Sequence, residues 1–88
     1  MAYTVLVSPA ARRDVKRIHG PSRRRIADAI DDLANDPRPQ GCTKLAGEEE
    51  LYRLRIGDYR VIYQIEDDRL IVLVVRVGHR KDVYRGSR

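Results

Sequence analysis

Three arginines, Arg53, Arg55 and Arg60, lie close together in the stretch LYRLRIGDYR, and their spacing indicates a shared binding surface. Arg53 and Arg55 fall on one face of an alternating strand, because successive side chains of a strand point to opposite faces. Gly57-Asp58 is typical of a two-residue hairpin turn, which would place Arg60 directly opposite Arg55. Guanidinium groups bind phosphates through paired hydrogen bonds. The cluster therefore predicts a phosphate site, and we expect the phosphate to belong to RNA.

Stability alone does not account for a pair such as Arg55 and Arg60. Like charges directly opposite each other destabilise a sheet, and departures from such local rules are expected at functional sites. The alternative interpretation is that these long side chains spread into solvent from an exposed sheet face and bind nothing.

A second motif, VGHRKDVYR (77–85), follows an apolar stretch. Its glycine permits a turn. If the preceding connection turns tightly at Asp67-Asp68, the end of the apolar stretch lies beside the arginine hairpin. Arg80 and Tyr84 could then reach the arginine face, where arginine contacts RNA phosphates and tyrosine stacks on bases.

The net charge also favours an anionic partner. Lys and Arg number 18 against 13 Asp and Glu, which gives a net charge of +5. Such a balance is typical of nucleic-acid binding, although solubility alone could also explain it. We expect RNA or an acidic partner to contact the remaining basic residues, with a solvated helix face as the alternative for those before residue 26. They are Arg12, Arg13, Lys16, Arg17, Arg23, Arg24 and Arg25, with Lys81 and Arg85 in the last motif.

Length and composition narrow the class of protein. The 88 residues are expected to form one domain, 1–88. The single cysteine, Cys42, excludes an internal disulfide. It fits the reducing, cytoplasmic setting that we expect, with a secreted protein stabilised by other means as the alternative. No signal-peptide pattern or membrane-length apolar run is present, so no membrane partner is expected. No cofactor or metal is expected either.

Hydrophobic periodicity predicts the N-terminal elements that must support these residues. Residues 2–7 are typical of a strand, and Ser8-Pro9 is typical of a helix start. Gly20 is expected just beyond the end of the first helix, and Asn35-Asp36-Pro37 should end the second. The buried stripes at helical spacing are Ala11, Val15 and Ile18 in the first helix and Ile26, Ile30 and Leu33 in the second.

The rest of the chain is predicted to be a loop over 36–50 followed by strands at 51–56, 59–65 and 70–77. The last strand is apolar on both faces, so it should be interior and covered on both sides. The order β-α-α-β-β-β indicates an α+β fold: a four-stranded, mainly antiparallel sheet with both helices on one face. The hairpin residues expected beneath the helices are Tyr52, Leu54, Ile56, Tyr59, Val61, Tyr63 and Ile65.

The sequence LYRLRIGDYRVIYQI (51–65), the apolar strand 70–77 and the motif VGHRKDVYR (77–85) resemble the RelE toxins of bacterial toxin–antitoxin systems, within the RelE/ParE superfamily. The resemblance covers nearly the whole chain. It implies a ribosome-dependent ribonuclease that cuts mRNA in the A site and so inhibits translation. It also implies a cognate antitoxin, RelB-like or other, that wraps the toxin. Operator DNA would be bound only through the toxin–antitoxin complex.

The resemblance also implies catalytic roles for individual residues. The family's basic strand pair, usually lysines, falls on Arg53 and Arg55, and the arginine of its GYR-like turn motif falls on Arg60. The arginine after the last strand's glycine falls on Arg80, and the C-terminal tyrosine falls on Tyr84. Arginine cannot serve as a general base, because it stays protonated. A base on the strand is therefore in doubt here, and we expect Tyr84 to be the base or to stack on a base. His79 is the alternative proton carrier, because histidine as a residue type titrates near neutral pH. The other interpretation of His79 is a partly exposed histidine at a strand end without a role in the chemistry.

A ParE-type toxin is the alternative, since it shares the fold but inhibits DNA gyrase by binding and cuts no RNA. ParE-type chains generally lack the full set of strand basics, post-glycine arginine and terminal tyrosine. This chain has all of them, so the RelE type is favoured.

Overall fold

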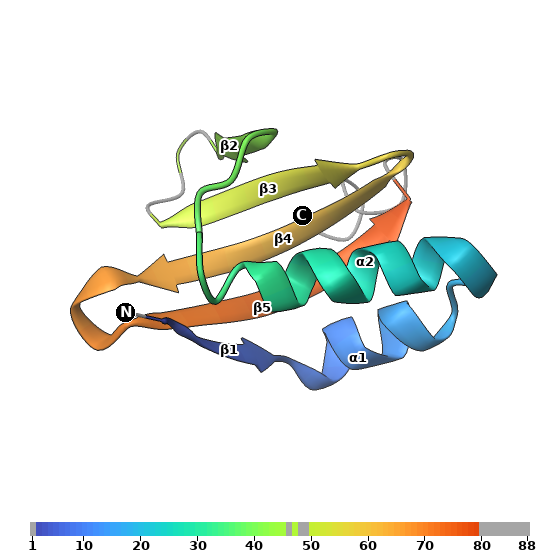
Figure 1. Cartoon of the computed structure of the whole chain (residues 1–88), viewed down its shortest axis with the longest axis horizontal. Helices are drawn as coiled ribbons and strands as arrows, with labels where there is room; N and C mark the ends of the chain where they lie inside the picture. Colours follow the sequence, from blue (N-terminus) through green and yellow to red (C-terminus); the bar gives the residue numbers. More distant parts are fainter. Residues whose placement is uncertain (1, 46, 48–49, 80–88) are drawn as a thin grey trace.

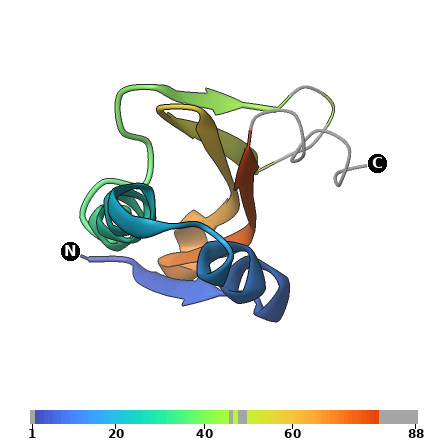
Figure 2. The same ribbon diagram turned by 90° about the vertical axis from the view of Figure 1, so that its right-hand side faces the viewer.

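The computed structural model describes residues 2–45, 47 and 50–79. In Figure 1 the helices lie together on one side of the sheet, and Figure 2 shows the same layering from the end. This arrangement confirms the predicted α+β class. The elements are, in order, β1 (Thr4–Val7), α1 (Pro9–Lys16), α2 (Gly20–Asp32), β2 (Cys42–Lys44), β3 (Leu51–Ile56), β4 (Tyr59–Glu66), the 3₁₀ helix η1 (Asp67–Arg69) and β5 (Ile71–His79).

Within the described residues the sheet has five strands in the order β1-β5-β4-β3-β2. It is antiparallel except where β1 runs parallel to β5. The prediction of four strands was wrong, because β2 lies inside the stretch 36–50 that was expected to be a loop. A strand as short as β2 does not show the alternation of apolar and polar residues from which strands are predicted. It exists because Cys42, Thr43 and Lys44 pair with β3.

The predicted register of the arginine hairpin is confirmed. Ile56 pairs with Tyr59, and Arg55 pairs with Arg60. Gly57 opens the turn with a φ of +59°, a conformation that glycine adopts without a Cβ penalty. This register turns the apolar face of the hairpin toward the helices, so that Tyr52, Leu54, Val61, Tyr63 and Ile65 are buried and Ile56 and Tyr59 pack against them.

The second helical stripe is confirmed, and the first is confirmed except that Ile18 lies beyond the end of α1 at Lys16. Ala11 and Ile18 of the first stripe are buried, and Val15 packs against them partly exposed. Ile26, Ile30 and Leu33 of the second are buried over the sheet. β5 is interior, between β4 and β1, but it is not covered on both sides. Val72, Val74 and Val77 are buried while alternate residues stay partly exposed, because the helices cover only one face.

Several helix and turn boundaries differ from the predicted ones. Gly20, with a φ of +53°, is the first residue of α2, whereas it was expected directly beyond the end of the first helix, which ends earlier, at Lys16. α2 ends at Asp32, before the predicted Asn35–Pro37 boundary. The second hairpin does not turn tightly at Asp67-Asp68, because η1 intervenes and Leu70 then takes a φ of +54°.

β1 pairs only with residues 71–74 of β5, so the edge of β5 beyond them is left without a neighbouring strand. α1 covers this edge. Ser8 caps the helix by accepting from the Ala11 N–H at 3.1 Å, and its hydroxyl donates to the Val75 carbonyl at 2.8 Å. Asp14 is 9% exposed. Its carboxylate accepts from the Val77 N–H at 2.9 Å and from Nε and Nη2 of Arg76 at 2.8 and 3.3 Å. This ion pair raises the pKa of Arg76.

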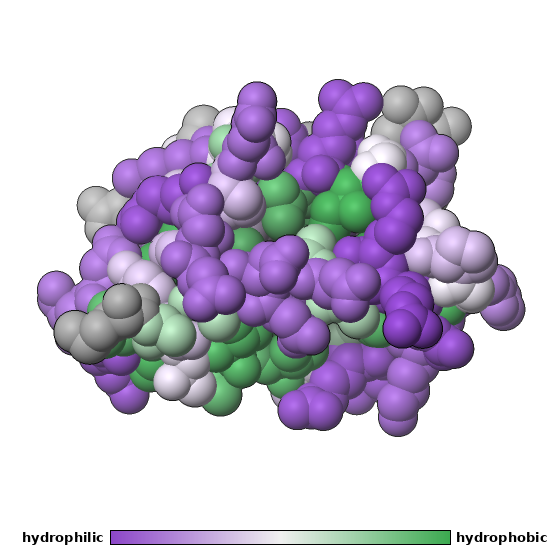
Figure 3. Space-filling view, viewed as in Figure 1, coloured by the Kyte–Doolittle hydropathy of each residue, from purple (hydrophilic) through white to green (hydrophobic). Residues whose placement is uncertain are grey.

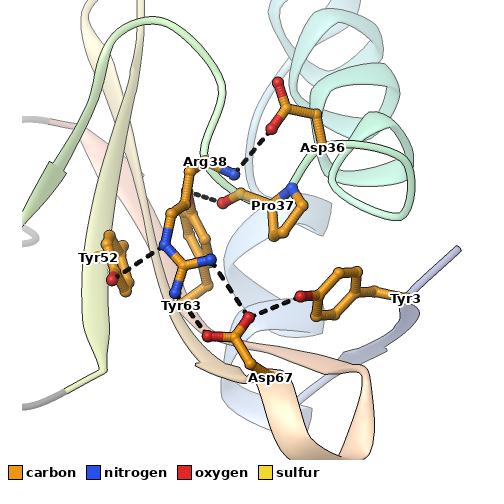
Figure 4. Close-up of polar contacts among 7 residues, drawn as sticks. All are labelled: Tyr3, Asp36, Pro37, Arg38, Tyr52, Tyr63 and Asp67. Atoms are coloured by element: carbon orange, nitrogen blue, oxygen red, sulfur yellow. Dashed lines mark hydrogen bonds and ion pairs between the residues drawn. The ribbon is translucent and has the colours of Figure 1, made fainter. Parts of the chain in front are cut away.

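A polar network joins four segments at the end of the sheet opposite the Gly57-Asp58 turn, and Figure 4 shows its side chains. Asp67 accepts from the Tyr3 hydroxyl at 2.6 Å and from Nη2 of Arg38 at 2.9 Å. Arg38 Nε also donates to the Tyr52 hydroxyl at 3.2 Å. The Arg38 guanidinium, helped by Tyr3, lowers the pKa of Asp67. The network holds together the residue before β1, the segment after α2, β3 and the β4–β5 connection.

Candidate nucleic-acid site

The three arginines line one cleft of about 260 Å³ on the sheet face opposite the helices, together with Gly41, Cys42 and Thr43. We call it the arginine cleft. β3 contributes Arg53 and Arg55, β4 contributes Arg60, and β2 with the residue before it forms the remaining wall. Sequence reasoning missed this wall. The glycine at position 41 was the sequence feature that could have indicated this strand. Its φ is +92°, and the chain turns there into β2.

Within the arginine cleft the cations differ in exposure. Arg55 is exposed, whereas Arg53 and Arg60 are partly buried, and Nε and Nη1 of Arg60 are buried from solvent. Arg60 lies between Arg55 on β3 and Gly78 on β5. Since Gly78 has no side chain, nothing projects from β5 beside Arg60 at this pairing. The arrangement can hold an anion with permanent cations, and none of the arginines can accept a proton.

His79 does not enter the arginine cleft. It pairs with Tyr59, one position beyond the pairing of Arg60 with Gly78. Its ring meets the Tyr59 ring edge-on, with centroids 5.8 Å apart and planes at 78°. Tyr59 packs against the core under the helices, so His79 lies on the helix side of the sheet. The structure therefore separates the candidate proton carrier from the arginines.

The other predicted residues of the last motif, Arg80, Lys81, Tyr84 and Arg85, lie outside the described residues. Their expected approach to the arginines remains a prediction. β5 does end at His79, close to the arginine hairpin, because Gly78 pairs directly with Arg60.

The basic residues before residue 26 are exposed on α1, just after it, and on α2, and we call them together the basic helix surface. Figure 3 shows hydrophilic side chains over most of this face, with hydrophobic surface between them. One of these basic residues, Arg25, reaches the hairpin. Its Nη1 lies 3.6 Å from the position that a Cβ would occupy if Gly57 had a side chain. The basic helix surface and the arginine cleft lie on opposite sides of the sheet. The exposed members of the basic helix surface are Arg12, Arg13, Lys16, Arg17, Arg23, Arg24 and Arg25.

In the part of the chain that the structure describes, no group of three or more His, Cys, Asp or Glu side chains could hold a metal ion. None of the described helices combines the length and apolar character needed to cross a membrane.

Comparison with known proteins identifies the class to which this fold and cleft belong. Residues 5–84 match the family described as ParE toxin of type II toxin-antitoxin system, parDE. The chain is 35% identical over 89 residues to the toxin RelG of Mycobacterium tuberculosis, covering 97% of this chain and 99% of RelG. The chain therefore belongs to this family of type II toxins.

Several relatives are RelE toxins, and the toxin RelE of Mycobacterium tuberculosis is 32% identical over 88 residues, covering 94% of this chain and 87% of RelE. The mRNA interferase toxin RelE of Escherichia coli is 28% identical over 83 residues, covering 92% of this chain and 86% of RelE. The archaeal RelE-RelB complex from Pyrococcus horikoshii contains a chain that superposes with a TM-score of 0.80 at 28% identity, covering 91% of this chain and 97% of that one. The protein is a RelE-type toxin.

Proposed function

We propose that this toxin is an endoribonuclease that cuts mRNA in the ribosomal A site and so stops translation. The observation that carries the proposal is the arginine cleft, in which Arg53, Arg55 and Arg60 line one hollow of the sheet surface. The similarity to the Escherichia coli mRNA interferase supports the same activity. Work on ribosomes would place the protein in the cytoplasm.

The proposed reaction is transesterification within the RNA. The 2′-OH attacks the adjacent phosphorus, its proton passes to a base, and the 5′-oxygen leaves with a proton from an acid. The products are a cyclic phosphate and a free 5′-OH. Negative charge gathers on the phosphoryl oxygens in the transition state, so fixed cations there lower the barrier. Arg60 is assigned to the scissile phosphate together with Arg80, and Arg53 and Arg55 orient the backbone.

Tyr84 is the proposed proton carrier or base-stacking residue. The position of His79 on the helix side supports this choice, because a general base must come within hydrogen-bond reach of the proton that it takes. Nearby guanidinium groups favour the anionic form of a phenol. Catalysis would therefore draw its cations from β3 and β4 and its proton carrier from the chain beyond β5.

Two macromolecular partners follow from this assignment. The basic helix surface is proposed to contact ribosomal RNA or to receive an acidic segment of a cognate antitoxin, RelB-like or other. The archaeal relative was solved as a RelE-RelB complex, which supports an antitoxin here. Operator DNA would be reached only through the toxin–antitoxin complex.

A gyrase-directed toxin of the ParE type is the second candidate. The description of the matching family, which names ParE, favours it. The arginine cleft argues for the nuclease, because inhibition of gyrase by binding needs no phosphate-holding cleft.

The decisive experiment is a reconstituted translation reaction on a defined mRNA, with cut positions mapped by primer extension. Replacing Arg60 by alanine should lower the cleavage rate about 100- to 1,000-fold, the usual effect of losing one transition-state donor. Arg69→Ala is the matched control: it removes one exposed arginine from η1, at the other end of the sheet, and should cut like the parent. Absence of cuts, together with blocked gyrase supercoiling, would instead establish the ParE type.

A further inference from the structure

A second cleft, of about 370 Å³, opens on the helix side of the sheet and is not used by the proposed chemistry. We call it the helix-side cleft. It lies between the end of α1 and the paired ends of β4 and β5. Its volume falls within the range of about 300–1,000 Å³ that is usual for small-ligand sites. The lining residues are Asp14, Arg17, Ile18, Tyr59, Arg76, Val77, Gly78 and His79.

Two aromatic rings line the helix-side cleft and could contact a flat ligand. Tyr59 and His79 line it with their rings in an edge-to-face arrangement, 5.8 Å between centroids. Unstacked RNA bases are held on tyrosine and histidine rings and on arginine guanidinium planes. Arg17, exposed at the end of α1, supplies such a plane and a positive charge at the rim.

The carboxylate in this cleft does not oppose an anionic ligand strongly. Both oxygens of Asp14 are engaged by the Arg76 guanidinium, and one also accepts from the Val77 N–H. The ion pair balances the Asp14 charge, so Arg17 and the two rings set the character of the remaining surface.

The two clefts meet at one end of the sheet. Arg60, which lines the arginine cleft, pairs with Gly78, and the next pair, Tyr59 with His79, lines the helix-side cleft. Neighbouring residues of a strand point to opposite faces. A strand of RNA that rounds this end could therefore place a phosphate on one face and the next base on the other.

We propose that the helix-side cleft binds the base of a nucleotide adjacent to the scissile phosphate. The base would stack on the His79 ring and meet the Tyr59 ring, which stands at 78° to it, edge to face, with Arg17 at the nucleotide's phosphate. The proposal rests on the proposed nuclease function and adds a substrate-positioning site to it. His79 acts there through its ring plane and takes no proton from the substrate.

The test uses ribosomes programmed with matched mRNAs that carry either an intact or an abasic nucleotide on each side of the mapped cut. In the parent toxin, loss of the base on one side should lower kcat/KM about 5- to 150-fold, the usual range for one stacked base. His79→Ala should show that loss already with intact mRNA and little further loss with the abasic mRNA. Arg69→Ala should respond to the abasic nucleotide as the parent does.

His79→Phe separates stacking from proton transfer. Phenylalanine keeps a ring but cannot titrate, so this variant should retain cleavage and its dependence on the base. Loss of cleavage in His79→Phe as large as in His79→Ala would overturn the stacking role. Independent, multiplying losses from His79→Ala and from the abasic nucleotide would overturn the site itself.

Two other results have separate meanings. If the parent cuts neither mRNA, the nuclease function fails and this proposal falls with it. If the parent cuts normally and His79→Ala and Arg17→Ala weaken only antitoxin binding, the helix-side cleft belongs to a protein partner and the nucleotide site is rejected.

Discussion

At the scale of single residues, Arg55 and Arg60 face each other across the hairpin, although a sheet would be more stable without that pair. The same pairing places two permanent cations in the arginine cleft. Arginine in both strand positions provides charge and paired donors but no base. The site is therefore built for holding a phosphate, and the proton must move through another residue.

Arg55→Thr should separate stability from activity. Removing the like charge and inserting a β-branched residue should raise the free energy of unfolding by about 0.2–1 kcal/mol, while cleavage on programmed ribosomes falls. Urea unfolding and the cleavage assay measure the two effects. Lys44→Thr, an exposed change on β2, controls for strand propensity. A less stable Arg55→Thr protein would show that the pair is not a source of strain.

At the scale of elements, α1 is fixed to β5 by Asp14, which lies 62 and 63 residues from its partners Arg76 and Val77 along the chain. The carboxylate satisfies a backbone N–H at an edge that β1 does not cover. Buried donors without an acceptor are costly, so this contact sets where the last strand ends relative to the helix. The helix-side cleft, which residues of both elements line, depends on that placement.

Asp14→Ala should lower the free energy of unfolding by about 2–3 kcal/mol, because the Val77 N–H and the Arg76 guanidinium lose their acceptor together. Arg76→Ala should cost less, since the Arg76 side chain is 42% exposed and Asp14 would still accept from Val77. Thermal and urea unfolding of both variants test the order. Equal losses in the two variants would mean that the backbone hydrogen bond contributes little.

At the scale of the whole molecule, the two ends of the sheet have different roles. One end carries the arginine cleft and the helix-side cleft. The other is held by the network of Tyr3, Arg38, Tyr52 and Asp67, which connects the residue before β1, the segment after α2, β3 and the β4–β5 connection.

The network predicts a pH dependence of stability. Arg38 and Tyr3 hold the pKa of Asp67 below its ordinary value, so the folded protein binds fewer protons there than the unfolded chain does. The stabilisation is present above about pH 4, the usual carboxyl value, and is lost as pH falls through the lowered pKa. The melting temperature of Asp67→Asn should therefore fall less between about pH 5 and pH 2 than that of the parent. Parallel curves would rule out this contribution.

The sequence by itself determined the helical stripes and the arginine hairpin, because both rest on local rules. Ile26, Ile30 and Leu33 share a face through helical spacing alone, and Gly57-Asp58 with strict alternation fixes the pairing of Arg55 with Arg60. Those local rules also predicted the fold class and which face of the hairpin is buried.

Tertiary structure alone decided that β2 lines the arginine cleft and that His79 lies on the helix side of the sheet. β2 forms only because β3 is there to pair with it, and η1 in place of a tight turn cannot be read from Asp67-Asp68. His79 lies on the helix side because the pairing of β4 with β5 sets it opposite Tyr59. Asp14 gained its role from an open strand edge far along the chain. Each of these depends on contacts between segments distant in sequence, which no local pattern records.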